Sequence, residues 1–240
     1  MADSKLNGGE IIVKSLEEQG VDRVFCVPGE SFLPVLDALQ TSSIETVLAR
    51  QEGGAAMMAE ADGKLTGRPG VVIVTRGPGA TNASAGIHIA QQDSTPVIML
   101  VGQIARNMKG RDAFQEVDFV KFFGDMAKHV EEVDDVENMA AVMENAFKVA
   151  MSGRPGPVVI ALPEDMLYDQ CSAKIAPRVS VHHPEPQAGD IEAVKLMLAK
   201  AERPFVIAGG PLWDQEDVSA LSRFAKAYDI PVSCLSLIHI

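Results

Sequence analysis

Cysteine is scarce in this sequence, with three among 240 residues, at positions 26, 171 and 234. The number is odd and the three lie far apart, so they form no disulfide framework. Neither they nor the five histidines are spaced like metal ligands. These absences indicate a reducing compartment, and we expect a cytoplasmic protein with no metal site in this segment.

Basic residues are also few, because 21 Lys and Arg face 33 Asp and Glu, for a net charge of −12. Binding to nucleic acid or to an anionic membrane needs a basic face, so neither is expected as a partner. No apolar run approaches the roughly 18 residues of a membrane-spanning helix. No signal-peptide run precedes the acidic pair at 17–18.

Two familiar phosphate-binding motifs are missing. The glycine turn at 77–82 has Asn82 where a dinucleotide fingerprint has its third glycine, and no acidic residue follows at the ribose distance. Gly63 and Lys64 are followed by Leu65 and lack the upstream glycine spacing of a Walker loop. The sequence therefore excludes both motifs.

Apolar strand-like runs do alternate with helical patterns up to about residue 165. Capping signals at Asn7–Glu10 and Asp134–Glu137 open two of the helices, and Asp112 with Gln115 is expected to cap a short helix ending at Phe123. This alternation predicts an α/β fold with a doubly wound, six-stranded parallel sheet. The expected strands are 23–27, 44–48, 71–74, 96–101, 126–130 and 158–162.

The pattern changes after residue 165. Residues 166–189 are rich in Pro, His, Gln and Ser, which is typical of a linker. Residues 190–240 predict a second unit with one β-α-β pattern, too small to bury a core of its own. We therefore expect the chain to be a truncated piece of a longer protein.

The candidate site lies where strands of a parallel sheet end, because ligands bind at that edge. Glu52 opens a helix directly after the strand 44–48 and is followed by two glycines. Such an acid beside a glycine turn suits a flat heterocyclic cofactor that needs a proton moved. Two simpler interpretations stay open: Glu52 as a helix-start acid favoured by the macrodipole, and the glycines as tight turns only.

Six short motifs, taken together and in this order, resemble the thiamine diphosphate-dependent enzymes, and among them the large subunit of acetolactate synthase. They are Val-Pro-Gly-Glu at 27–30, Arg-Gln-Glu-Gly-Gly-Ala-Ala at 50–56, Gly-Arg-Pro-Gly at 67–70, Gly-Pro-Gly-Ala-Thr-Asn at 77–82, Asp-Ala-Phe-Gln-Glu at 112–116 and Ser-Gly-Arg-Pro-Gly-Pro at 152–157. The resemblance covers about residues 7–165. It implies that 1–165 is the pyrimidine-binding domain and that 190–240 is the start of a Rossmann-like central domain. Residues 235–240 do not continue like the family and are interpreted as a non-native end.

The resemblance also implies roles for individual residues. Glu52 is the catalytic residue, which hydrogen-bonds a ring nitrogen of the aminopyrimidine and so favours the tautomer that deprotonates the thiazolium carbon. Phe114 and Gln115 line the substrate approach, and Gln115 has the alternative interpretation of a cap residue. The residues implied to bind the cofactor are Pro28, Gly29, Glu30, Thr75, Gly77, Pro78, Gly79 and Asn82.

The implied activity is that of a carboligase, which decarboxylates pyruvate or a similar 2-oxo acid and joins the acyl equivalent to a second carbonyl. The implied cofactors are thiamine diphosphate and Mg²⁺, the latter bound by a C-terminal domain that is missing from this chain, while FAD is left open. The implied assembly is a homodimer or homotetramer.

Two residues depart from the family pattern. Gln51 stands where the family commonly has histidine, and Glu30 stands where acetolactate synthases usually have glycine. These departures keep alternatives open: a related 2-oxo acid decarboxylase or acyltransferase of the superfamily, or a non-catalytic module of the same fold.

Overall fold

The fold was analysed in a computed structural model that describes residues 5–182, 185–211 and 213–235. The chain divides into two compact units, Met1–Val181 and His182–Ile240. Each unit is described by itself.

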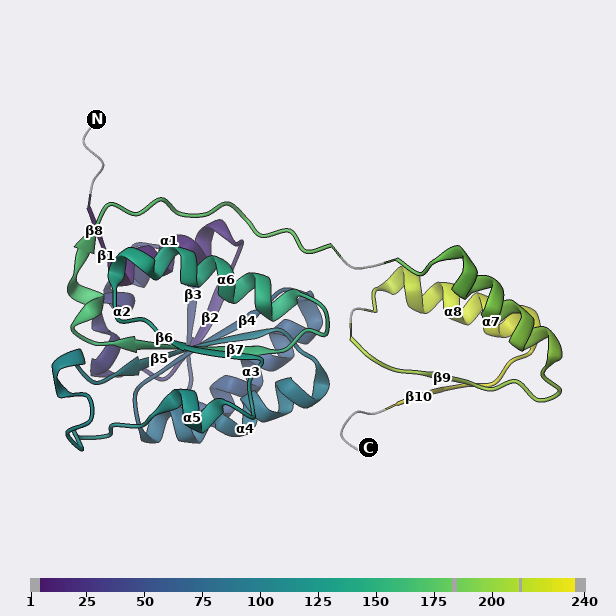
Figure 1. The fold of residues 1–240 in the computed structure, drawn as a ribbon, viewed down its shortest axis with the longest axis horizontal. Coiled ribbons are helices and arrows are strands. Elements are labelled where there is room, and N and C mark those ends of the chain that lie inside the picture. Colours follow the sequence, from purple (N-terminus) through teal and green to yellow (C-terminus); the bar gives the residue numbers. More distant parts are fainter. Residues whose placement is uncertain (1–4, 183–184, 212, 236–240) are drawn as a thin grey trace. The chain divides into compact units, whose positions relative to one another are not determined.

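The first unit is built on a six-stranded sheet in which all neighbouring strands are parallel (Figure 1). The strand order is β3-β2-β4-β5-β7-β6. This confirms the predicted fold class. The strands are β2 (Arg23–Cys26), β3 (Glu45–Leu48), β4 (Gly70–Val74), β5 (Val97–Gln103), β6 (His129–Glu132) and β7 (Pro157–Pro163).

Helices cover both faces of this sheet. One layer consists of α1 (Gly8–Glu18), α2 (Leu33–Gln40) and α6 (Met139–Met151), and the other of α3 (Glu52–Thr66), α4 (Pro78–Asp93) and α5 (Phe119–Phe123) (Figure 1). Alternate strand residues serve the two cores. Val71 and Ile73 of β4 face the first layer, while Val72 and Val74 face the second. Because both faces are covered, β4 and β5 are buried throughout.

The order of the strands creates a switch point beside β2. The chain passes from β2 outward to β3 and then returns to place β4 on the other side of β2. The segments after β2 and β4 therefore leave the sheet in different directions from the same edge. In open α/β sheets, ligands bind outside the carboxyl ends of the strands at such a point.

Some of the predicted helix starts are correct and others are wrong. The capping box of Asn7 with Glu10 is present. In place of the box predicted at 134–137, Asp135 accepts from the Glu137 amide in a short 3₁₀ turn, η3 (Val136–Asn138), and α6 follows. Asp118, and not Asp112, caps α5.

The prediction at 112–115 failed because the chain forms a loop there. Both Asp112 and Gln115 have positive φ values, 54° and 64°, which no helix contains. The strand expected at 126–130 begins only at His129, since the Met126 and Ala127 amides still bond the Phe123 carbonyl in a turn.

Residues 166–181 do not behave as a linker, because they lie against the first unit. β8 (Gln170–Cys171) pairs antiparallel with β1 (Leu6–Asn7), next to the 3₁₀ turn η4 (Met166–Tyr168). The Gln19 side chain donates to the Pro177 carbonyl at 3.1 Å and accepts from the Val179 amide at 2.8 Å. The boundary between the units therefore falls at 181/182 and not at 165.

The second unit contains the expected β-α-β pattern. It consists of α7 (Ala188–Lys200), β9 (Val206–Ala208), α8 (Gln215–Tyr228) and β10 (Val232–Cys234), with β9 and β10 parallel. Its assignment as the start of a Rossmann-like domain stays a prediction. Of the interpreted non-native end, 235–240, only Leu235 lies within the described residues.

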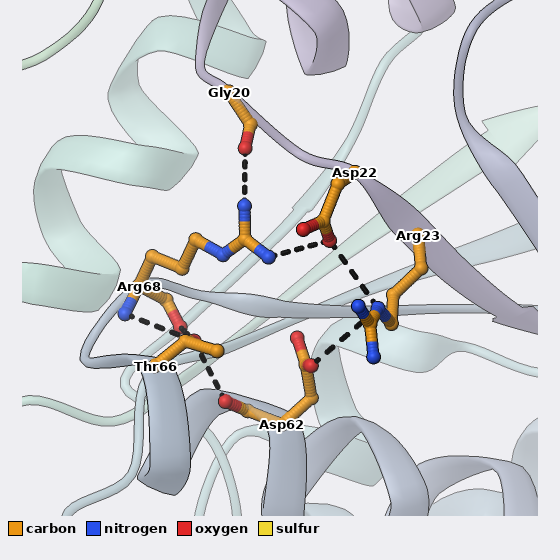
Figure 2. A network of polar contacts seen from close by, with 6 residues as sticks. All are labelled: Gly20, Asp22, Arg23, Asp62, Thr66 and Arg68. Carbon is orange, nitrogen blue, oxygen red and sulfur yellow. Dashed lines mark hydrogen bonds and ion pairs between the residues drawn. The ribbon is translucent and has the colours of Figure 1, made fainter.

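A polar network secures the end of α3 that lies far from Glu52 (Figure 2). Arg68, just after α3, donates to the Gly20 carbonyl and to the Asp22 carboxylate. Asp22 also accepts from Arg23 at 3.3 Å, and Arg23 lies 3.9 Å from Asp62 of α3. These contacts tie α3 to the segment that enters β2, which limits how far the helix can move.

Within the described residues, no helix is both long enough and apolar enough to cross a membrane.

Candidate active site

Glu52 is the first residue of α3 and follows β3 by four positions. The residue before it, Gln51, is the N-cap, whose Oε1 accepts from the Gly54 amide at 2.8 Å. Side-chain capping satisfies an amide that the helix leaves without a partner. The departure noted at position 51 therefore has a local structural role, which is to start the helix that presents Glu52.

Glu52 is a half-buried residue, and its two carboxylate oxygens have different surroundings. Asn82 of α4 donates from Nδ2 to Glu52 Oε2 at 3.1 Å. A Cβ built on Gly79 would lie 3.6 Å from Glu52 Oε1. One oxygen is thus held by an amide, and the other faces a position that carries no side chain. A side chain at residue 79 would contact Oε1 and Thr75, so glycine there keeps this side of the carboxylate free of a side chain.

The segments after β2 and β4 contact each other at the switch point. A Cβ on Gly29 would lie 2.6 Å from Thr75 Cβ, and one on Gly79 would lie 2.9 Å from Thr75 Cγ2. Thr75 also shares a hydrogen bond of 2.8 Å with Ser31. The structure therefore brings Gly29, Thr75, Gly79, Asn82 and Glu52 into one connected group, as the sequence-based hypothesis required.

The two residues predicted to line the substrate approach, Phe114 and Gln115, differ in their contacts. Gly77 has φ 55° and ψ −113°, and a Cβ on it would lie 2.7 Å from Gln115 Cβ. Gln115 therefore rests on the turn after β4. Phe114 is 76% exposed and projects from the loop. Pro28 and Pro78 are also exposed, on either side of the switch point.

The loop that carries Phe114 and Gln115 is closed by Glu116, which sequence reasoning did not single out. Its carboxylate accepts from the Gly110 amide at 2.6 Å and from the Ala113 amide at 3.0 Å. These backbone amides lower the pKa of Glu116, because they stabilise the charged form. The only sequence signal was an acid next to a short loop that contains glycine.

Arg76 is the second residue that sequence reasoning missed. It is buried and lies between Thr75 and Gly77 in the chain. Its guanidinium donates to Glu30 at 3.1 Å and to Glu164 at 3.0 Å. Glu30 was singled out as a cofactor residue, and the structure places it in this ion cluster. The available signal was an arginine at the end of an otherwise apolar strand.

A second arginine clamps the same edge farther along the sheet. Arg106, in the 3₁₀ turn η2 (Arg106–Met108) after β5, donates to Asp165 at 2.9 Å and to Asp169 at 2.7 Å. Burial opposes the charged form of Asp165, but the hydrogen bonds from Arg106 outweigh it and lower the pKa of that carboxyl. This clamp joins the segments after β5 and β7.

Residues 6–122 match the family model described as "Thiamine pyrophosphate enzyme, N-terminal TPP binding domain". The matched segment contains Glu52, the Gly77–Asn82 turn and the loop closed by Glu116.

Several curated relatives are acetolactate synthases. The chain is 40% identical over 232 residues to the acetolactate synthase isozyme 2 large subunit of Escherichia coli (strain K12), covering 95% of this chain and 42% of that protein. It is 36% identical over 237 residues to the acetolactate synthase of Mycobacterium bovis, covering 97% and 38%. It is 35% identical over 238 residues to the chloroplastic acetolactate synthase of Arabidopsis thaliana, covering 96% and 35%. The chain thus spans about two fifths of the length of the relatives it matches.

Proposed function

We propose that this chain, which belongs to the thiamine pyrophosphate enzymes through its N-terminal TPP binding domain, is the N-terminal part of an acetolactate synthase-like carboligase. It would act on pyruvate or a similar 2-oxo acid. The observation that carries the proposal is the Glu52 carboxylate, held by Asn82 at one oxygen and facing Gly79 at the other.

Each residue of this group has a separate task toward the aminopyrimidine. Glu52 Oε1 would share a proton with a ring nitrogen, because it lies beside Gly79, which has no side chain. Asn82 keeps the carboxylate in that orientation through Oε2. Gly29 and Thr75 would bound the ring from the side of β2.

When bound, thiamine diphosphate supplies the electron sink that 2-oxo acid decarboxylation and carboligation require. The protein contributes control of a proton at Glu52 and a fixed position for the ring. We infer that the diphosphate and Mg²⁺ are held by residues outside this chain, since the matching family domain ends at residue 122 and the relatives are more than twice as long as the matched segment.

The first test uses ¹⁵N-labelled chain titrated with thiamine, and separately with a hydroxyethylthiazole that lacks the pyrimidine. We expect amide shifts at Gly77, Gly79 and Asn82 with thiamine, and none at these positions with the thiazole. Shifts of equal size with both ligands, or with neither, would show that this edge does not recognise the pyrimidine.

The second test is Glu52→Gln in a protein extended to the length of its relatives. We expect proton exchange at the thiazolium carbon to slow by about 10²–10⁴-fold, the usual range for a lost acid–base group. An amide cannot share a proton as a carboxyl group does. Exchange at the wild-type rate in a folded variant would remove Glu52 from the mechanism.

A second candidate is a related 2-oxo acid decarboxylase or acyltransferase of the same superfamily. The observation that favours it is Glu30, a carboxylate paired with Arg76 at the site edge where the acetolactate synthase pattern has glycine. Product analysis with pyruvate separates the two candidates, because a carboligase releases acetolactate and a decarboxylase releases acetaldehyde.

We also propose that the protein forms a homodimer or a homotetramer. Ala55, Ala56 and Ala59 of α3 are buried, but Met57 and Met58 on the same helix are 45% and 37% exposed. Covering these two side chains by a second copy would remove apolar surface from water. Light scattering before and after Met57→Glu tests this, and an unchanged mass would contradict a role for this face.

A further inference from the structure

Arg76, Glu30 and Glu164 form an ion triad at the carboxyl edge of the sheet. Arg76 follows β4, Glu30 begins the 3₁₀ turn η1 (Glu30–Phe32) after β2, and Glu164 follows β7 directly. The Arg76 side chain is only 11% exposed, whereas those of Glu30 and Glu164 are 62% and 37% exposed. One buried cation therefore connects three separate strand ends.

The triad is built to hold backbone segments and not to bind an anion. Both terminal nitrogens of Arg76 already donate to carboxylates, and the three charges sum to −1. Its Nε is buried and has no hydrogen-bond partner among the described residues. A buried guanidinium needs such pairing to offset desolvation, so removing one member leaves an uncompensated charge.

The neighbours of Arg76 in the chain are the residues that contact the rest of the site. Thr75 touches Gly29 and Gly79, and Gly77 lies under Gln115. The Arg76 carbonyl accepts from the Gly79 amide at 3.4 Å, and the Gly77 carbonyl accepts from the Thr81 amide at 3.0 Å. Fixing the Arg76 side chain therefore fixes the turn that leads into α4, and through α4 it fixes Asn82 against Glu52.

We propose that Arg76 is a positioning residue for the aminopyrimidine site, an inference that rests on the proposed function. The triad sets the spacing between the segment after β2 and the turn after β4, which determines where Gly29, Gly79 and Asn82 lie relative to Glu52. It also accounts for the carboxylate at position 30, because Arg76 supplies its counter-charge. Residues 30, 76 and 164 consequently act as one unit and cannot be exchanged singly.

The test compares two variants with a matched control. Arg76→Met breaks the triad and leaves two carboxylates, while Arg76→Met/Glu30→Gln/Glu164→Gln removes the triad without leaving a charge. The control is Arg106→Met, since Arg106 also bridges two carboxylates at this edge but pairs with Asp165 and Asp169. Each variant is made in the 240-residue chain.

Amide hydrogen exchange is measured first, without any ligand. We expect Gly79 and Thr81 to exchange at least about tenfold faster in Arg76→Met and in the triple variant, with Ile87 and Ala90 in the second half of α4 unchanged. The triple variant should regain the wild-type unfolding midpoint but not the slow exchange. Arg106→Met should leave both amides at wild-type rates.

Thiamine titration is the second measurement. Both variants that lack Arg76 should bind about tenfold more weakly than wild type, and Arg106→Met should bind as wild type does. Wild-type exchange and wild-type affinity in the triple variant would overturn the proposal. If wild type itself binds no thiamine, the proposed function fails, and the exchange comparison alone still decides whether the triad positions the turn.

Discussion

Single residues in this site have tasks that their type alone does not reveal. Gln51 caps α3, Glu116 closes the loop that contains Phe114, and Arg76 neutralises the charge of the Glu30 carboxylate. The sequence placed Glu52, Gly79 and Asn82 correctly at one edge, since motif order and strand ends determine it. It could not indicate that Arg76 meets Glu164, because the two lie 88 positions apart and no periodic pattern links them.

The loop at 110–116 should respond to pH through Glu116. The folded-state pKa of Glu116 is lowered, so the loop is stabilised above the ordinary glutamate pKa of about 4.3 and loses this stabilisation as pH falls further. We expect the amide proton shifts of Gly110 and Ala113 to titrate with a midpoint below about 4.3. Glu116→Gln should abolish this titration. A midpoint at or above the ordinary value would contradict the assigned bonds.

At the scale of elements, the site depends on how closely α3 and α4 approach. A Cβ on Gly86 of α4 would lie 2.6 Å from Ala56 Cβ and 2.9 Å from the Ala56 carbonyl carbon. Because backbone cannot yield as a flexible side chain does, any larger residue there must push the helices apart. That displacement would act directly on the bond between Asn82 and Glu52.

Gly86→Ala should therefore destabilise the protein by about 1–3 kcal/mol, the usual cost of overpacking. Gly54→Ala on α3 is the control, since the nearest atom to its Cβ is 3.9 Å away, and it should be neutral or stabilise by up to about 1 kcal/mol. Urea unfolding measures both. The Asn82 side-chain amide shift should change only in Gly86→Ala, and equal stability of the two variants would refute close packing at this crossing.

Element positions were predicted well where burial is periodic and poorly where the chain turns. The runs of β4 and β5 are buried throughout, so their apolar sequences identified them. The short helix near Phe123 was given the wrong cap, because an Asx residue with a polar partner three positions later also occurs in loops. Positive φ at Asp112 and Gln115 decided that case, and sequence carries little trace of it.

At the scale of the whole chain, the extent of the first unit is the main revision. Met166 and Leu167 are fully buried, and Leu167 lies against Gly8 of α1. A segment rich in proline and polar residues concealed these contacts. The residue composition correctly predicted where regular structure stops. It did not predict that the irregular segment still packs on the core.

A protein ending at residue 181 should therefore be more stable than one ending at 165. Deleting the buried Met166 and Leu167 side chains alone forfeits about 3–6 kcal/mol of burial free energy at the usual value for apolar groups. Thermal unfolding of the two lengths, matched in concentration, measures the difference. Identical unfolding midpoints would mean that 166–181 contributes nothing to the core.

The cap at Gln51 constrains how this site can diverge. An imidazole introduced by Gln51→His would lie next to Glu52 at the start of α3, but the Gly54 amide would lose its present acceptor. The gain of a new proton-transfer group would therefore be accompanied by a weaker start of the helix that carries Glu52. Losing the N-cap bond costs about 0.5–2 kcal/mol at the usual value, so one hydrogen bond couples the choice of residue 51 to the stability of the helix start that carries Glu52.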